Sequence, residues 1–301
     1  MTPSTWHLPV DGGSIGGVEQ AGSDPCLLFI PNAGSPALGW STLFDQLSDC
    51  RAIALDRRGH ALSYSAPFED GNEHWGDVIR VTQGLQLTRP ILVGHSTGGF
   101  VALCAAAARP DLFSAVVTIE TGLLDEPQDV VDQMLEDSYD DEIVTTVAER
   151  FSAGRVFHDE REIEDFVAAH RFGASQDWVT ADIQQDLSDE IRYTIVKRPD
   201  GTWLRTPDVQ ALRESLNRNS NCRYYPNAEL YDLIELPVHV VQTEDGYSVT
   251  PPEQVERLTA RRPNLRFHDI GGGHFAHYSH AVPLASIIRS VAQETYRPSA
   301  A

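Results

Sequence analysis

One short segment limits the possible folds more than any other part of the chain. Residues 91–99 read ILVGHSTGG, an apolar run ending in the pattern G-x-S-x-G, and residues 99–108 (GFVALCAAAA) form a small-residue run typical of a helix. In such a strand-turn-helix segment the serine lies on a sharp turn, and the flanking glycines let the backbone pass its neighbours without a clash. The same pattern also occurs in ordinary glycine-rich loops. Its position between a predicted strand and a predicted helix indicates a nucleophilic serine, Ser96.

The composition indicates a soluble globular protein and argues against several partners. The chain has 301 residues, of which 41% are hydrophobic and 22% charged, enough for one domain with an insertion or for two domains. Its net charge of −21 disfavours nucleic acid and anionic membrane surfaces, because both bind cationic patches. No apolar run has the length of a membrane span and residues 1–13 do not resemble a secretory signal, so we expect a cytoplasmic protein. The four cysteines lack metal-site spacing, so we expect no metal.

Strand and helix patterns alternate in two parts of the chain and change between them. Residues 128–136, 142–151 and 160–170 are acidic amphipathic stretches, and residues 192–205 suggest a hairpin that turns at Pro-Asp-Gly. We therefore predict that residues 1–121 and 230–301 form one parallel sheet covered by helices, and that residues 122–229 form a mainly helical cap. The predicted strands of the sheet are residues 26–30, 51–55, 90–93, 115–120, 238–242 and 264–268, and the predicted helices are 40–47, 73–85, 99–108, 252–260 and 281–294.

Among the eleven histidines, His274 is the strongest candidate for a base that activates Ser96. A serine hydroxyl is a weak nucleophile at neutral pH and needs a base within hydrogen-bond reach, a role that suits the imidazole group. His274 follows three glycines directly after the last predicted strand. A flexible loop at the end of a strand can place an imidazole where a helix or a strand could not. The histidines at positions 60, 95, 277 and 280 lack this combination.

With these motifs in this order, the chain resembles cap-bearing enzymes of the α/β-hydrolase fold. Residues 56–63 (DRRGHALS) match the family's D-x-R-G-H-G-x-S loop with Ala61 in place of the second glycine, residues 236–238 (LPV) open a strand as the family does after its cap, and residues 273–275 match its histidine loop. The resemblance covers the chain outside the cap. It implies a mostly parallel eight-stranded sheet with helices on both faces and a helical cap insertion.

The resemblance also implies roles for the residues around these loops. Asp56 is expected to brace the loop that follows it, and Arg57 and Arg58 are expected to be surface or loop-anchoring charges. The family stabilises its oxyanion with two backbone amides, which here correspond to Thr97 and to Ala33 in the segment PNAG. The family's H-G-x motif is absent from that segment, so the second amide could shift by one residue.

The acid that orients the histidine departs from the family pattern. Most relatives place it after the penultimate strand as G-x-x-D, but this chain reads TEDG at residues 243–246. Gly246 therefore stands at the usual acid position. Asp245 comes one residue early and Glu244 two residues early.

A second carboxylate, Glu120, ends the apolar predicted strand at residues 115–120. A carboxylate at the end of an apolar strand needs a partner, because an unpaired buried charge is costly. The ends of these two strands should be neighbours in the sheet, so either acid could reach His274. Haloalkane dehalogenases and zearalenone-type lactone hydrolases resemble this chain in carrying a glutamate on the earlier strand. We predict Glu120 as the orienting acid and keep Asp245 as the alternative; a structural salt bridge at the cap hinge is the other role open to Glu120.

These residues together predict a serine hydrolase that cleaves an ester or lactone of an apolar small molecule through an acyl-enzyme. Ser96 would be the nucleophile, His274 the base and Glu120 the orienting acid, and no metal or organic cofactor is required. Serine at the turn argues against dehalogenase and epoxide hydrolase chemistry, whose attacking residue there is a carboxylate. Residues 274–280 (HFAHYSH) resemble the zearalenone-lactonase branch most, and that resemblance suggests Trp178 of the cap as a substrate-pocket residue.

Other functions remain open at this stage. The same groups could serve a thioesterase, a carbon–carbon bond hydrolase or a cofactor-free perhydrolase. A non-catalytic receptor for a small ligand is an alternative of another class, although an intact Ser96 and His274 argue against it. The sequence leaves the natural substrate and the oligomeric state undetermined.

Overall fold

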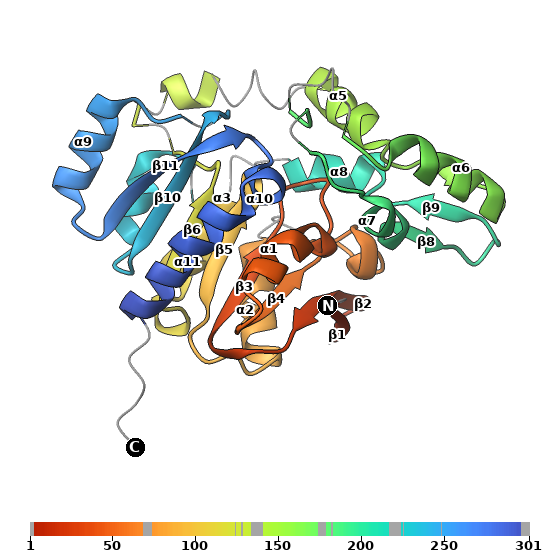
Figure 1. Cartoon of the computed structure of the whole chain (residues 1–301), viewed down its shortest axis with the longest axis horizontal. Coiled ribbons are helices and arrows are strands. Elements are labelled where there is room, and N and C mark those ends of the chain that lie inside the picture. Colours follow the sequence, from red (N-terminus) through yellow and green to blue (C-terminus); the bar gives the residue numbers. More distant parts are fainter. Residues whose placement is uncertain are drawn as a thin grey trace.

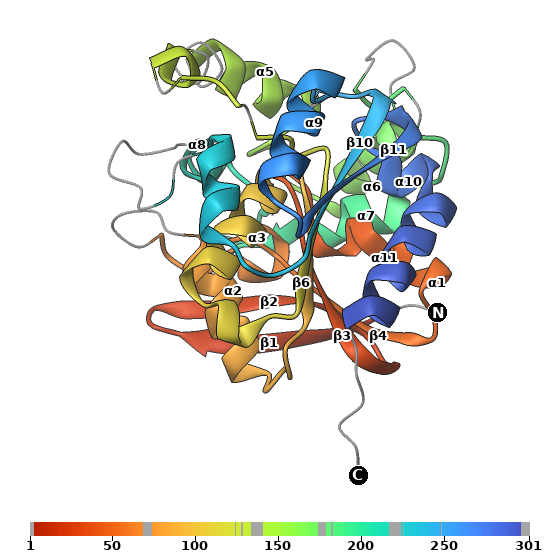
Figure 2. The same ribbon diagram turned by 90° about the vertical axis from the view of Figure 1, so that its left-hand side faces the viewer.

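The computed structural model describes residues 3–68, 74–123, 125–127, 129–133, 141–173, 179–181, 183–216, 224, 226–247 and 249–295. An eight-stranded sheet forms the centre of the molecule, and helices cover both of its faces (Figures 1 and 2). None of the described helices combines the length and the apolar character that crossing a membrane requires. The described residues also contain no group of three or more histidine, cysteine, aspartate or glutamate side chains that could hold a metal ion.

The sheet has the strand order β1-β2-β4-β3-β5-β6-β10-β11. Strand β2 runs antiparallel to both of its neighbours, β1 and β4, and the other neighbouring strands pair in parallel. The predicted mostly parallel eight-stranded sheet is therefore confirmed. Its strands are β1 (Ser4–Val10), β2 (Gly13–Gln20), β3 (Ser23–Ile30), β4 (Cys50–Leu55), β5 (Ile91–His95), β6 (Ala115–Ile119), β10 (Val238–Asp245) and β11 (Leu265–Gly273).

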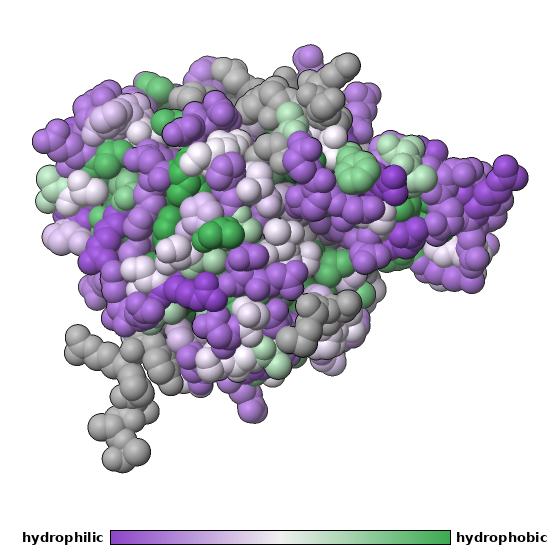
Figure 3. Space-filling view, in the orientation of Figure 1, coloured by the Kyte–Doolittle hydropathy of each residue, from purple (hydrophilic) through white to green (hydrophobic). Residues whose placement is uncertain are grey.

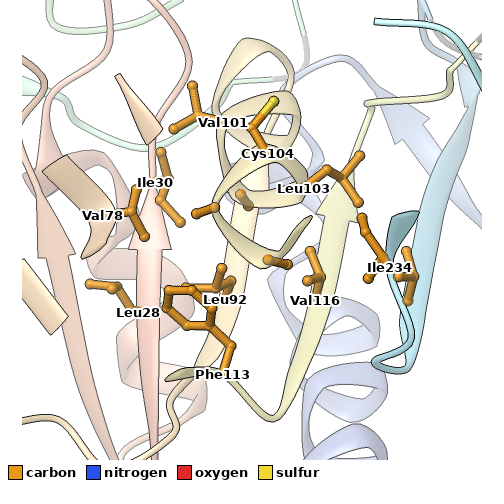
Figure 4. Packing of buried hydrophobic residues seen from close by; sticks show 14 of the residues in the cluster. Leu28, Ile30, Val78, Leu92, Val101, Leu103, Cys104, Phe113, Val116 and Ile234 are labelled. Carbon is orange, nitrogen blue, oxygen red and sulfur yellow. The ribbon is translucent and has the colours of Figure 1, made fainter. Parts of the chain in front are cut away.

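Both faces of the central strands are buried, which explains why these strands read as continuous apolar runs. In β5, Leu92 belongs to the hydrophobic cluster on one face of the sheet, whereas Ile91 and Val93 belong to the cluster on the other. Successive side chains of a strand point to opposite faces, so a strand covered on both sides has no polar alternation. Figure 4 shows Leu92 packed among residues of the first cluster.

The helices divide between the two faces in the same way. Helices α2 (Trp75–Gly84) and α3 (Thr97–Ala108) contribute to the first cluster, and α1 (Ser41–Gln46) and α11 (Ala281–Thr295) to the second. Helix α9 (Pro252–Arg261) packs beside β11. Each of these helices corresponds to a predicted one, with ends that differ by a few residues.

The described residues 141–216, which we refer to as the cap segment, form helices and a small separate sheet. The predicted helices at residues 142–151 and 160–170 and the predicted hairpin at residues 192–205 are confirmed, with Gly201 in the turn at a φ of 89°. The predicted helix at residues 128–136 lies partly outside the described residues. The elements are α5 (Asp141–Phe151), β7 (Val156–Phe157), α6 (Glu160–His170), α7 (Ser188–Tyr193), β8 (Ile195–Lys197), β9 (Trp203–Arg205) and α8 (Val209–Leu216).

The cap segment lies to one side of the large sheet and packs on loops that follow its strands (Figure 1). Phe151 lies against Gly34, after β3, and its ring is 6.4 Å from that of Phe275, after β11. The Tyr193 hydroxyl donates to Asp56, after β4. The projecting end of the segment is largely hydrophilic in Figure 3. The division of the chain into domains at residues 121/122 and 229/230 stays a prediction.

Candidate active site

Ser96 lies on the sharp turn between β5 and α3 that the sequence predicts. Its backbone has a φ of 50° and a ψ of −123°, a conformation that residues other than glycine rarely adopt. Such strain persists only where the surroundings fix it. Here the Ser96 N–H donates to the Ile119 carbonyl at 2.9 Å, and the Thr121 hydroxyl donates to the Ser96 carbonyl at 2.6 Å.

The glycines on both sides of Ser96 are required by close packing. A Cβ at position 94 would lie 2.5 Å from the carbonyl oxygen of Gly98. A Cβ at position 98 would overlap the carbonyl oxygens of Ile30 and Pro31, at the end of β3. Any side chain at either position would push the turn away from the sheet. The glycines around Ser96 therefore let the backbone pass its neighbours without a clash, as the sequence predicts.

His274 directly follows β11 and is 7% exposed. The His95 Nε2–H donates to the His274 carbonyl at 2.7 Å, and the Tyr247 ring lies edge-on to the imidazole with 4.7 Å between centroids. Burial lowers the pKa of His95 well below its usual value, so that ring is neutral. Within the described residues, neither Ser96 Oγ nor His274 Nε2 makes a hydrogen bond. Catalytic hydrogen bonds are often open in resting enzymes and close when substrate binds.

Glu120 is the carboxylate that contacts His274. Its Oε2 lies 3.4 Å from His274 Nδ1, and the residue is 1% exposed. The carboxylate also accepts hydrogen bonds from the Thr243 N–H and Thr243 hydroxyl, each at 2.9 Å, and from the Tyr247 N–H at 2.8 Å. Burial raises the pKa of Glu120, but the hydrogen bonds from His274 and Thr243 outweigh it and hold the pKa below its usual value. The carboxylate is therefore ionised and fully hydrogen-bonded.

The other candidate acid lies elsewhere. Asp245 and Glu244 are exposed at the end of β10 and, among the described contacts, make none to His274. A Cβ at position 246, where the family pattern would place its aspartate, would overlap the Glu120 carboxylate. Glu120 therefore fills the space next to the usual acid position, from the neighbouring strand.

The two residues predicted for the oxyanion site lie together, but in an unexpected arrangement. Thr97 is the first residue of α3, where backbone N–H groups have no partner within the helix. The Ala33 N–H donates to Thr97 Oγ1 at 2.9 Å, and the Arg57 guanidinium donates to the same oxygen at 3.0 Å. The Ala33 amide is therefore already engaged by the Thr97 side chain. The next amide, that of Gly34, donates to the His60 ring at 3.0 Å.

Asp56 is buried and braces its loop, as the resemblance implies. Its carboxyl group accepts from the Ala37 N–H at 2.7 Å, the Leu62 N–H at 3.2 Å and the Tyr193 hydroxyl at 2.6 Å. Burial raises the pKa of Asp56 to about 7 against the opposing effect of these hydrogen bonds. Asp56 thus connects the core to α7 of the cap segment and does not contact His274 among the described residues.

Arg57 and Arg58 anchor loops and do not lie on the surface. Each is 4% exposed. The Arg58 guanidinium pairs with Asp77 at 2.7 Å, and Arg57 donates to the Ser215 carbonyl at 2.9 Å. Of the two roles expected for them, the surface role is wrong because partners for both side chains lie inside the fold.

A cavity of about 570 Å³ lies between the cap segment and the loops after β3 and β11. Its walls include Gly34, next to Ala33, and Phe275, next to His274. Aromatic rings contribute much of the lining, which also includes one acidic residue, Glu190, and three arginines, Arg150, Arg171 and Arg205. Trp178, the predicted pocket residue, lies outside the described residues. The cavity thus borders two residues that flank the candidate catalytic groups.

The strand order, the turn at Ser96 and the histidine after the last strand define the class of protein. A sequence profile of the alpha/beta hydrolase fold family matches residues 25–281, and the chain belongs to this family.

Individual relatives match in different ways. The 2-(acetamidomethylene)succinate hydrolase of Mesorhizobium japonicum is 36% identical over 105 residues, which cover 34% of this chain and 38% of that relative. A serine hydrolase-like protein of Danio rerio is 25% identical over 319 residues, which cover 96% of this chain and 88% of that relative. The solved thioesterase domain from the curacin biosynthetic pathway has a TM-score of 0.68 and 21% identity, and the likeness covers 96% of this chain and 100% of that one.

Proposed function

We propose that the protein hydrolyses an ester or lactone of an apolar small molecule through an acyl-enzyme on Ser96. The observation that carries the proposal is the contact between His274 Nδ1 and the buried Glu120 carboxylate, beside the strained turn that holds Ser96. A carboxylate on Nδ1 leaves Nε2 as the nitrogen that can take a proton. An orienting acid, a base and a serine together can activate a hydroxyl for attack on a carbonyl carbon.

In the first step, His274 Nε2 takes the proton of the Ser96 hydroxyl as Oγ attacks the carbonyl carbon of the substrate. A bond forms between Oγ and this carbon, and the carbonyl oxygen becomes an oxyanion. The Thr97 amide at the N-terminus of α3 donates to the oxyanion. Glu120 stabilises the imidazolium that forms. The bond to the leaving oxygen then breaks, and His274 returns the proton to the departing alkoxide.

In the second step, water replaces the alcohol. His274 removes a proton from the water molecule, whose oxygen attacks the acyl carbon. The bond to Ser96 Oγ breaks, Ser96 takes the proton back from His274, and the free acid leaves. The net reaction consumes one water and yields one acid and one alcohol; with a lactone both groups stay on one molecule.

The Ala33 N–H, the predicted second donor to the oxyanion, is already hydrogen-bonded to Thr97 Oγ1. It can donate to the oxyanion only if that hydrogen bond opens. Trp178 stays a proposed substrate contact, and the aromatic part of the cavity lining fits an apolar substrate. One relative, whose match covers 96% of this chain, is named a serine hydrolase-like protein, and that name agrees with a serine nucleophile.

Hydrolysis of p-nitrophenyl butyrate and of a macrolactone tests the proposal. We expect Ser96→Ala to lower kcat by at least about 10⁴-fold, because the nucleophile is lost. Exposed Ser65→Ala is the matched control and should retain wild-type rates. A fluorophosphonate should add to the wild type once, and the added mass should be absent from Ser96→Ala. A wild type that binds apolar ligands but turns over neither substrate would favour the receptor alternative.

A further inference from the structure

The Thr97 hydroxyl receives two hydrogen bonds in the resting site. The Ala33 N–H donates to Oγ1 at 2.9 Å, and Arg57 Nη1 donates to it at 3.0 Å. A hydroxyl oxygen has two lone pairs and one proton, so these two donors fill its accepting capacity. The proton of the Thr97 hydroxyl is left to donate, and no described residue accepts it.

The position of Thr97 indicates what its proton could reach. Thr97 directly follows the nucleophile and is only partly buried, whereas Ala33 and Arg57, which hold its oxygen, are buried. The backbone amide of Thr97 already lies at the end of α3, where the positive end of the helix favours a negative group. The amide and the hydroxyl of one residue can therefore face the same developing charge.

We propose that the Thr97 hydroxyl is the second donor to the oxyanion that forms on the substrate bound to Ser96, in the place that the sequence assigned to the Ala33 amide. The proposal rests on the acyl-enzyme mechanism above. The Ala33 N–H acts on Thr97 Oγ1 and keeps the hydroxyl in position, so its hydrogen bond stays closed during the reaction.

Arg57 is a positioning residue in this arrangement. Its guanidinium is 4% exposed and is held at a second point by the Ser215 carbonyl at 2.9 Å. A buried cation is little screened by water, and a hydroxyl that accepts from a cation becomes a stronger donor through its own proton. Arg57 thus places positive charge one hydroxyl away from the oxyanion without contacting the substrate.

Steady-state kinetics with p-nitrophenyl butyrate tests the role of the hydroxyl. Thr97→Val keeps the shape and removes the hydroxyl, and we expect kcat to fall about 100-fold with little change in KM, as for loss of one oxyanion donor. Thr97→Ser keeps the hydroxyl and should stay within about fivefold of the wild type. Binding of a boronic acid, which forms a tetrahedral anion on serine, should weaken in parallel with kcat. Thr97→Ala repeats the test if Thr97→Val does not fold.

The opposite result would assign the donor to Ala33. If Thr97→Val retained or exceeded the wild-type kcat, the hydroxyl would only be covering the Ala33 amide, and the proposal would be wrong. The proposed function would survive that result, because the wild type would still turn over the ester. If the wild type neither hydrolysed the ester nor reacted with a fluorophosphonate, both the proposed function and the proposal for the Thr97 hydroxyl would be wrong.

A double-mutant cycle tests whether Arg57 acts through Thr97. Arg57→Gln should lower kcat about tenfold without raising KM, and Arg57→Lys should restore part of it, because the charge returns. Added to Thr97→Val, Arg57→Gln should cause little further loss, since its route to the oxyanion is already gone. Fully multiplicative losses would show that Arg57 acts by another route and would overturn its assigned role.

Discussion

The ends of β6 and β10 are neighbours in the sheet, but their acidic residues have opposite environments. Glu120, after β6, is 1% exposed, has a φ of 54° and accepts hydrogen bonds from Thr243 and Tyr247 as well as contacting His274. Asp245, at the end of β10, is exposed to solvent. Gly246 stands at the usual acid position after β10, and the carboxylate beside it is that of Glu120, from the neighbouring strand.

The two strand ends offer alternative sources for one carboxylate beside His274. The Cβ that an aspartate at position 246 would carry overlaps the Glu120 carboxylate, so the two arrangements exclude one another. The backbone of the β10 end contacts this carboxylate: the N–H groups of Thr243 and Tyr247 donate to Glu120. The end of β10 thus donates hydrogen bonds to the carboxylate that follows β6.

Replacement of the two acids should give the largest difference. We expect Glu120→Gln to lower kcat/KM for p-nitrophenyl butyrate by about 10³- to 10⁴-fold, because the amide favours the wrong tautomer of His274 and cannot balance the imidazolium charge. Asp245→Asn, the matched control, should stay within about twofold, as expected for an exposed side chain away from the chemistry. A large loss in Asp245→Asn with little loss in Glu120→Gln would instead identify Asp245, on β10, as the orienting acid.

A methyl group at position 246 should have the next largest effect. Gly246→Ala would push the Glu120 carboxylate away from His274, and we expect kcat to fall by about 10²-fold, as for a small misplacement of a catalytic group. Gly76→Ala is the control, because a Cβ there meets only the end of the Arg80 side chain at 3.8 Å. Activity that survives Gly246→Ala would mean that His274 does not depend on the position of Glu120.

Removal of one hydrogen bond to Glu120 should have a smaller effect. Thr243→Val leaves the backbone bond and removes the hydroxyl bond at 2.9 Å, so we expect a loss of about 1 to 2 kcal/mol in the free energy of unfolding. Thr118→Val, in β6, removes a buried hydroxyl that has no hydrogen-bond partner among the described residues, and should cost little. Urea denaturation of both variants measures the difference. Equal losses would show that the Thr243 hydroxyl does not support the acid.

The smallest effect should appear in the pH dependence of stability. The pKa of Glu120 is lower in the folded protein than its usual value, so Glu120 adds stability above that usual value, and this stability is lost as pH falls through the folded pKa. Between about pH 5 and pH 3 the wild type should therefore lose more stability than Glu120→Gln, whereas Asp245→Asn should follow the wild type. Urea midpoints across this range provide the measurement. An unchanged pH slope in Glu120→Gln would contradict the lowered pKa.

The elements of the sheet were predictable because apolar periodicity and glycine-rich turns report directly on burial. Residues 26–30, 91–95 and 115–119 are buried, and each is apolar over most of its length. The hairpin of β1 and β2 was not identified from the sequence, because Gly13–Gln20 contains three glycines and lacks an apolar run. In the cap segment, β7 has only two residues, too few for a periodic pattern.

Of the candidate site, the sequence predicted the residues that stand in a recognisable motif or that carry a charge at the end of an apolar strand. Ser96 and His274 stand in motifs, and Glu120 ends an apolar strand where a charge needs a partner. The hydrogen bonds of Thr97, Arg57 and Thr243 join loops far apart in the sequence, and only the packing of those loops brings the groups together. Sequence order contains no comparable signal for such contacts.

The Nδ1 proton of His274 reports directly on whether Glu120 holds the imidazole in place. A proton NMR spectrum in water at mildly acidic pH should contain a downfield imidazole N–H resonance that is absent from His274→Ala. We expect this resonance also to disappear in Glu120→Gln and to persist in Asp245→Asn. A resonance that persists in Glu120→Gln but disappears in Asp245→Asn would show that Asp245, and not Glu120, orients His274.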